Sequence, residues 1–168
     1  MQEALFHIVC GSTGAGKSTY ARKLADEVGG LHFAIDDWMV TLFWKDSPQP
    51  IEFAWSIERV NRCEAQIAKL ALAGCARGVG AVLDLGFTKA EHRAKFAEIA
   101  RSANVGVKLH FLDVPADVRW RRVEGRNAEK GASYSLEVNR EMFDFVETMW
   151  EPPDSKELAA LNGIRVVE

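Results

Sequence analysis

Short apolar segments alternate with amphipathic stretches along the whole chain. Each apolar segment has the length of a strand, and most of the stretches between them are long enough to hold a helix that crosses back over a sheet. This alternation predicts an α/β fold in which a parallel sheet has helices on both faces. The expected strands cover residues 5–10, 31–35, 81–85, 107–114 and 164–167.

Three of the intervening stretches show clear helical signals. Between residues 55 and 73, apolar residues recur three or four positions apart, as on one face of a helix. Thr88 followed by Glu91 matches a capping box, which predicts a helix from there to about residue 100. Ser135 is predicted to cap another helix that runs to Trp150. On this last helix we assign one apolar stripe to the core: Met142, Phe145, Met149 and Trp150.

Length, composition and charge favour a single soluble domain. The chain has 168 residues, 48% of them hydrophobic, which is enough for one buried core. No repeat, low-complexity tract or linker divides it, so we expect one domain over residues 1–168. The formal net charge of −3 argues against long nucleic acid or an anionic membrane as a partner. The three cysteines lack metal or disulfide spacing, and no membrane span or signal peptide is evident, so a cytoplasmic location is expected.

Residues 11–18 match G-x-x-x-x-G-K-[ST], the phosphate-binding loop or P-loop. The motif follows a predicted strand and precedes a helical pattern, which is the setting that this loop requires. Its glycines let backbone N–H groups converge on phosphate oxygens beside a helix N-terminus. We expect Lys17 to neutralise the β- and γ-phosphates and the Ser18 hydroxyl to bind Mg²⁺. The predicted nucleotide-binding residues are Gly11, Ser12, Thr13, Gly14, Ala15, Gly16, Lys17, Ser18 and Thr19.

Acidic residues stand at the ends of two predicted strands. Asp36 and Asp37 follow the second strand, and Asp84 lies near the end of the third. Ligands bind at the carboxyl ends of parallel strands, so these side chains could face the terminal phosphate. Asp36 or Asp37 could accept the proton of an acceptor hydroxyl, or cap the next short helix. Asp84 could hold Mg²⁺, orient the acceptor, or cap the turn before Thr88.

Four arginines fall within eight residues of this acidic protein: Arg119, Arg121, Arg122 and Arg126. Helical spacing would place Arg119, Arg122 and Arg126 on one face, directed toward a glycine-bearing loop. Such a run is usually a solvated helix face, but its density here favours a lid at about residues 122–134 that closes over the phosphates. In that interpretation Arg122 and Arg126 stabilise charge on the transferring group.

A dense aromatic segment follows the paired aspartates. Aromatic side chains at this density can form a wall for a planar, sugar-like or cationic acceptor. They can equally be the packing beneath a helical flap. The predicted acceptor pocket consists of Asp37, Trp38, Phe43, Trp44 and Trp55.

The order of these motifs resembles that of the small P-loop kinases, a group that includes the kinase domain of phage polynucleotide kinase, chloramphenicol phosphotransferase and the zeta toxins. The chain is most similar to the stand-alone kinases described as AAA-domain proteins. The likeness covers nearly the whole chain, through "GSTGAGKST", "IDDW", "VLDLGFTKAEHR" and "FLDVPADVRWRRVEGRN". It implies a three-layer P-loop NTPase fold with five parallel strands in the order 2-3-1-4-5, Asp36 as general base, Asp84 on the metal side, and Arg122 and Arg126 in the lid.

We therefore expect a kinase that uses ATP and Mg²⁺ to phosphorylate a hydroxyl group of a small molecule, as a monomer or homodimer. The polynucleotide kinase pattern has a basic residue shortly after its paired aspartates, where this chain has Trp38, Met39 and Val40. A nucleic-acid end is for that reason a weaker choice of acceptor. The alternatives are a 5′-hydroxyl polynucleotide or nucleoside kinase, a nucleotide-binding switch or ATPase without an acceptor, and a toxin that acts on a sugar nucleotide.

Overall fold

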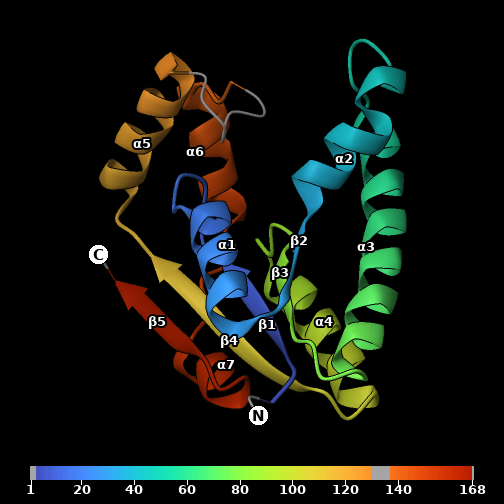
Figure 1. Cartoon of the computed structure of the whole chain (residues 1–168). Coiled ribbons are helices and arrows are strands. Elements are labelled where there is room, and N and C mark those ends of the chain that lie inside the picture. Colours follow the sequence, from blue (N-terminus) through green and yellow to red (C-terminus); the bar gives the residue numbers. More distant parts are fainter. Residues whose placement is uncertain (1–2, 130–136, 168) are drawn as a thin grey trace.

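The computed structural model describes residues 3–129 and 137–167. Its centre is a five-stranded parallel sheet, with each strand followed by helical structure on the way to the next (Figure 1). The strand order β2-β3-β1-β4-β5 confirms the expected topology. The strands are β1 (Leu5–Cys10), β2 (Leu31–Ala34), β3 (Ala81–Asp84), β4 (Gly106–Asp113) and β5 (Ile164–Val167).

Helices cover both faces of the sheet, and two pairs of them extend beyond its upper edge in Figure 1. The α2–α3 pair lies on one side of this edge and the α5–α6 pair on the other. None of the described helices is both long and apolar enough to cross a membrane. The helices are α1 (Lys17–Val28), α2 (Ile35–Phe43), the 3₁₀ helix η1 (Trp44–Asp46), α3 (Phe53–Cys75), α4 (Ala90–Ser102), α5 (Ala116–Glu129), α6 (Arg140–Met149) and α7 (Ser155–Ala160).

The alternation of side chains along β1 divides the core into two layers. Phe6 and Ile8 point to the layer that α3 and α4 cover, where Ile67 and Phe96 are fully buried. Val9 points to the opposite layer, against the apolar face of α1. Because both faces of this central strand are buried, its residues are almost all apolar, as expected for a parallel sheet.

Two helix starts differ from the sequence prediction. The capping box at Thr88 is wrong: Lys89 is the N-cap of α4, and no side chain of the cap accepts a hydrogen bond. Instead Glu151, beyond the end of α6, accepts from the Ala90 backbone N–H at 2.9 Å. The α6 helix begins at Arg140 with Asn139 as its cap, and the predicted cap Ser135 lies outside the described residues.

The apolar stripe predicted on the last long helix is wrong in part. Phe145 is 61% exposed and Met142 is 40% exposed, whereas Phe143 between them is buried. Trp150 does pack against the core, as predicted. The helix faces the core at a different angle because its inward face is fixed by contacts with α5, including the ring of Trp120 against Phe143.

A buried ion pair fixes α4 to the segment at α7. The guanidinium of Arg93 is fully buried and donates to both carboxylate oxygens of Glu157, at 2.5 and 2.9 Å. It also donates to the carbonyl oxygen of Phe87 at 3.0 Å. All of these bonds replace water around a charge that would otherwise be costly to bury.

We predict that Arg93→Ala lowers the free energy of unfolding by about 3 kcal/mol or more, because it leaves the Glu157 carboxylate without its partner. Urea unfolding followed by circular dichroism measures this change. Arg101→Ala is the matched control, since Arg101 lies on the same helix and pairs with Glu98 at the surface. That variant should lose less than about 1 kcal/mol. Equal losses in the two variants would contradict the prediction.

Candidate active site

The P-loop approaches its neighbours more closely than a side chain would allow. Gly14 and Gly16 have φ angles of 80° and 85°, in the left-handed region that favours glycine. A Cβ atom on Gly14 would lie 2.5 Å from the backbone oxygen of Arg119. Gly16 is the N-cap of α1, so the loop turns directly into the N-terminus of a helix. This is the backbone arrangement in which unpaired N–H groups bind an anion.

Glu147 on α6 connects the P-loop to the two helices beside it. The guanidinium of Arg119 donates to both carboxylate oxygens of Glu147, at 2.7 and 2.8 Å, and to the carbonyl oxygen of Thr13 at 3.1 Å. The hydroxyl of Ser12 donates to the same carboxylate. These bonds, that of Arg119 foremost, hold the pKa of Glu147 below its ordinary value. Arg119 therefore holds the loop in position and does not share the setting of Arg122 and Arg126.

Lys17 lies inside the loop that precedes it. Its ammonium donates to the carbonyl oxygen of Ser12 at 3.2 Å. Burial lowers the pKa of Lys17, and the carboxylates of Asp84 and Asp36 oppose that change. A polyphosphate beside this ammonium would favour its charged form further.

Ser18 and Asp84 bring oxygen atoms together at the base of the P-loop. The Ser18 hydroxyl donates to Oδ2 of Asp84 over 2.7 Å. Mg²⁺ binds through one or two protein oxygens and completes its shell with water and phosphate oxygens. Across the described residues, no group of three acidic, histidine or cysteine side chains would hold a metal alone. Ser18 and Asp84 therefore fit a Mg²⁺ ion that arrives with a nucleotide.

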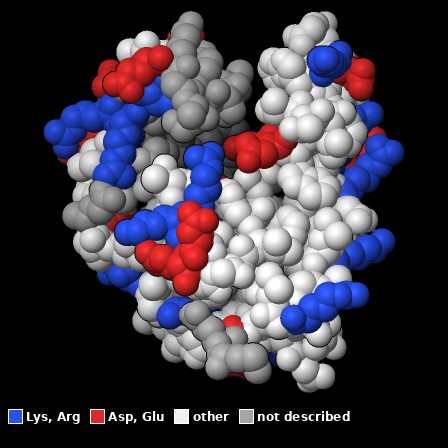
Figure 2. All heavy atoms as spheres, viewed as in Figure 1, with Lys and Arg blue, Asp and Glu red and all other residues white. Residues whose placement is uncertain are grey.

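One open cavity of about 470 Å³ brings most of the predicted site residues together. It lies in the hollow between the α2–α3 and α5–α6 pairs, which Figure 2 shows as a notch in the surface. Asp36 faces the P-loop across it. Gly11, Ser12 and Ala15 of the predicted set do not line it; Gly11 packs against Leu112. The predicted residues that line it are Thr13, Gly14, Gly16, Lys17, Ser18, Thr19, Asp36, Asp84, Arg122 and Arg126.

Asp36 has the electrostatic setting of a proton acceptor. It belongs to the first turn of α2, whose N-cap is Ala34, so neither Asp36 nor Asp37 caps the helix. Its carboxylate reaches solvent through the cavity, yet surrounding protein raises its pKa above the ordinary 3.8. Burial is the main cause, the charge of Asp84 adds to it, and Lys17 opposes it. A raised pKa makes a carboxylate a stronger base.

Arg122 and Arg126 lie on the cavity wall opposite Asp36. Nη1 of Arg122 is 3.5 Å from the carbonyl oxygen of Ala15 in the P-loop. Nε of Arg126 is buried and has no hydrogen-bond partner within residues 3–129 and 137–167. A buried donor without a partner carries a free-energy cost that a phosphate oxygen would remove. Residues 122–129 of the expected lid form the second half of α5, and Gly125 is helical. Residues 130–134 lie outside the described part.

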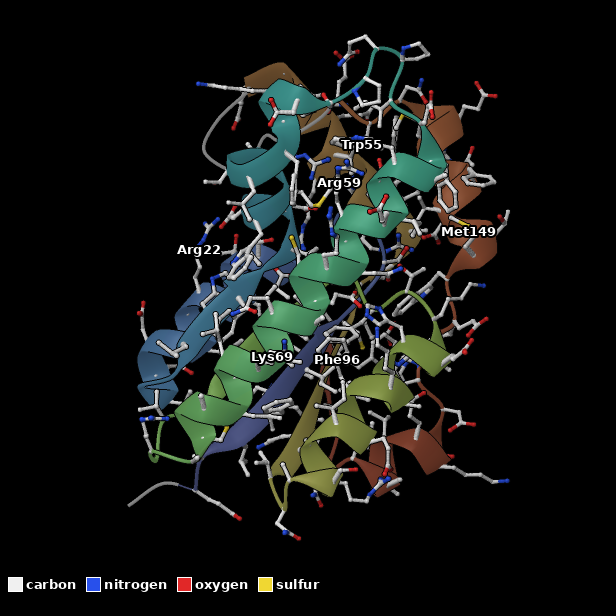
Figure 3. All side chains as sticks on the ribbon, turned by 90° about the vertical axis from the view of Figure 1, so that its right-hand side faces the viewer. Arg22, Trp55, Arg59, Lys69, Phe96 and Met149 are labelled. Carbon is white, nitrogen blue, oxygen red and sulfur yellow. The ribbon has the colours of Figure 1, made fainter. Side chains whose placement is uncertain are left out.

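A second cavity, of about 290 Å³, adjoins the first through Asp36. It lies between α2 and the N-terminal end of α3, where Trp55 projects (Figure 3). Phe43, Trp44 and Trp55 of the predicted acceptor pocket line it. Trp38 packs instead against the core, and Asp37 is exposed and lines neither cavity.

A third cavity, of about 410 Å³, lies on the other side of the P-loop and shares Gly16, Thr19 and Arg122 with the first. Its walls are Tyr20 and the apolar ends of β4 and β5. The sequence gives no signal for this cavity, because strand-end residues such as Leu112 and Val166 have the apolar character of ordinary core residues. Its size and apolar lining suit a nucleoside.

The sheet order and the P-loop between β1 and α1 define a P-loop NTPase fold. The chain belongs to the AAA domain family, whose model matches residues 6–149. No curated protein matches the sequence.

Solved structures that resemble the chain share its fold at low sequence identity. A sugar kinase from a Janibacter species has a TM-score of 0.66 at 19% identity, over 98% of this chain and 85% of that one. The APS kinase of Mycobacterium tuberculosis, solved with AMPPNP and APS, has a TM-score of 0.61 at 15% identity, over 99% and 90%. Kti12 from Chaetomium thermophilum, solved with ADP-AlF3, has a TM-score of 0.64 at 16% identity, over 96% and 88%.

We predict that Asp36→Asn makes the protein more stable at neutral pH. Because the folded state raises the pKa of Asp36, the charged carboxylate opposes folding wherever it is ionised. This penalty is full above the folded-state pKa and disappears as the pH falls below the unfolded-state value. The gain in unfolding free energy should therefore be largest near pH 7 and small near pH 3.

Urea unfolding at the two pH values measures this gain. Asp37→Asn is the control, because Asp37 is the exposed neighbour on the same helix turn. A gain that is equal at both pH values, or a loss at neutral pH, would show that Asp36 carries no such electrostatic cost.

Proposed function

We propose that the protein is an ATP-dependent kinase that transfers the γ-phosphate to a hydroxyl group of a small-molecule acceptor. The observation that carries the proposal is the shared position of Asp36. This carboxylate borders both the cavity of the P-loop and the aromatic cavity beside it. A base at that boundary can take a proton from one ligand while that ligand attacks another.

The P-loop side holds the donor nucleotide. Backbone N–H groups around Gly14 to Lys17 bind the phosphate oxygens, and Lys17 neutralises their charge. Ser18 and Asp84 would supply protein ligands to a bound Mg²⁺, which would reduce the negative charge that the acceptor hydroxyl meets. The apolar cavity beside Tyr20 takes the nucleoside.

The transfer step needs one proton acceptor and good alignment. The hydroxyl oxygen of the acceptor forms a bond to the γ-phosphorus while its proton passes to Asp36. The bond from the γ-phosphorus to the β,γ-bridging oxygen breaks, and ADP leaves with that electron pair. Arg122 and Arg126 stabilise the charge that spreads over the transferring group.

We predict that Lys17→Ala and Asp36→Ala separate nucleotide binding from transfer. Lys17→Ala removes the cation at the phosphates, so both nucleotide binding and transfer should be lost. Asp36→Ala removes the base but not the loop, so kcat should fall by about 10²- to 10⁴-fold while nucleotide affinity is kept. Calorimetric titration with AMPPNP measures the binding. A screen of alcohols for ATP consumption, with mass detection of the added phosphate, finds the acceptor and measures transfer.

Matched controls for these variants are Lys69→Ala, an exposed lysine of α3 (Figure 3), and Asp37→Ala. Both should behave as the wild type. If Asp36→Ala keeps full transfer activity, the assignment of the base is wrong. If ATP is hydrolysed at the same rate with every alcohol in the screen, the protein is an ATPase without an acceptor.

A further inference from the structure

We propose that the aromatic cavity accepts an uncharged alcohol with a flat, mainly apolar body, and that it rejects phosphorylated or sulfated acceptors. This inference rests on the proposed kinase function and names the class of its acceptor. It depends on the lining of the cavity, on the charges beside it, and on its supply of hydrogen-bonding groups.

The lining of the cavity is apolar over most of its surface. Seven of its ten residues are aromatic or aliphatic, and the others are two serines and Asp36. Its volume of about 290 Å³ is near the lower limit for small-molecule sites. A molecule with one or two rings would fill the cavity and bury the apolar surface of its wall. The seven are Met39, Val40, Phe43, Trp44, Ile51, Trp55 and Val60.

The only charge among the described lining residues is negative. Asp36 is needed there to meet the reacting hydroxyl, and no lysine or arginine lines this cavity. A phosphate or sulfate group on the acceptor would lie near that carboxylate without a cation of its own. Burying an unpaired anion is costly, and a neighbouring like charge adds to the cost.

The cation beside this wall, Arg59, packs against two of the aromatic rings that form it. Its guanidinium carbon lies 4.1 Å from the centre of the Trp55 ring and 5.9 Å from that of Phe43. The same guanidinium donates to the carbonyl oxygen of Trp55 at 3.0 Å, and Glu58 lies 3.5 Å away. Figure 3 shows Arg59 and Trp55 near the same end of α3. The charge of Arg59 thereby holds the indole ring and is partly balanced by Glu58.

Hydrogen-bonding groups are too few for a sugar. The hydroxyl of Ser47 already donates to the carbonyl oxygen of Trp44 at 2.8 Å. Ser56 supplies one more hydroxyl, and Asp36 is taken by the reacting group. A sugar would bring several hydroxyls into this space, and each one without a partner weakens binding.

Fluorine NMR with a matched pair of probes tests the proposal without relying on catalysis. The probes are 2-(4-fluorophenyl)ethanol and its phosphate ester, which share a ring and differ in charge; unlabelled glucose is the competitor. We expect the alcohol to bind the wild-type protein at least tenfold more tightly than the ester, and glucose not to displace it. Tighter binding of the ester, or displacement by glucose, would overturn the proposal.

Two variants place the binding in the cavity. Trp44→Ala removes an exposed part of the wall and should weaken alcohol binding about three- to tenfold. Phe53→Ala is its control, because Phe53 is an exposed aromatic of the same region that does not line the cavity. Val40→Arg adds a cation to the wall and should strengthen binding of the ester relative to the alcohol. Equal effects of Trp44→Ala and Phe53→Ala would place the alcohol elsewhere and overturn the proposal.

Phosphotransfer is then assayed separately with the same alcohol. If the alcohol binds in the cavity and no alcohol in the screen is ever phosphorylated, the cavity assignment stands and the kinase function fails. If the protein phosphorylates a sugar or a phosphorylated alcohol while the fluorinated alcohol does not bind, the kinase function stands and the acceptor class is wrong.

Discussion

The geometry of the site depends on the hydrogen bonds that the carboxylate of Glu147 accepts. It accepts from the guanidinium of Arg119 on α5 and from the hydroxyl of Ser12 in the P-loop, while its own backbone belongs to α6. Arg119 in turn donates to Thr13, and its backbone oxygen leaves no room for a side chain on Gly14. The shape of the loop is therefore set from outside as well as by its glycines. The arrangement fixes the backbone geometry of the loop in advance, which a free glycine-rich segment would not do.

The site also contains charged groups whose placement costs the folded protein free energy. Burial lowers the pKa of Lys17, and burial together with the charge of Asp84 raises the pKa of Asp36. Nε of Arg126 is buried and has no hydrogen-bond partner among the described residues. In the proposed function, a polyphosphate would be the partner of Lys17 and Arg126, and the acceptor hydroxyl would meet Asp36. The buried pair of Arg93 and Glu157 shows the contrast, because there each charge already has its partner.

The sequence predicted the parts of the structure that local patterns determine. The strands and the P-loop follow from apolar runs and one motif, and the position of Asp36 follows from the rule on strand ends. The order of the strands came from the resemblance to the small P-loop kinases. Tertiary partners determined the rest. Glu151 accepts a hydrogen bond at the start of α4 in place of the predicted cap, Arg119 binds Glu147, and Phe145 is exposed to solvent. The cavity beside Tyr20 was not predicted because its lining residues include ordinary ends of strands.

The position of Asp36 explains how such a fold could change its acceptor without losing its donor site. Helix α2 begins directly at the end of β2, so the backbone of Asp36 is fixed by the sheet. The aromatic wall comes from later turns of α2, from η1 and from the start of α3, and these do not pair with any strand. Side chains in this segment can therefore change in size or charge while the distance from Asp36 to the P-loop is kept by β2, β3 and β1. In the proposed function, recognition of the acceptor is therefore structurally separate from binding of the phosphates.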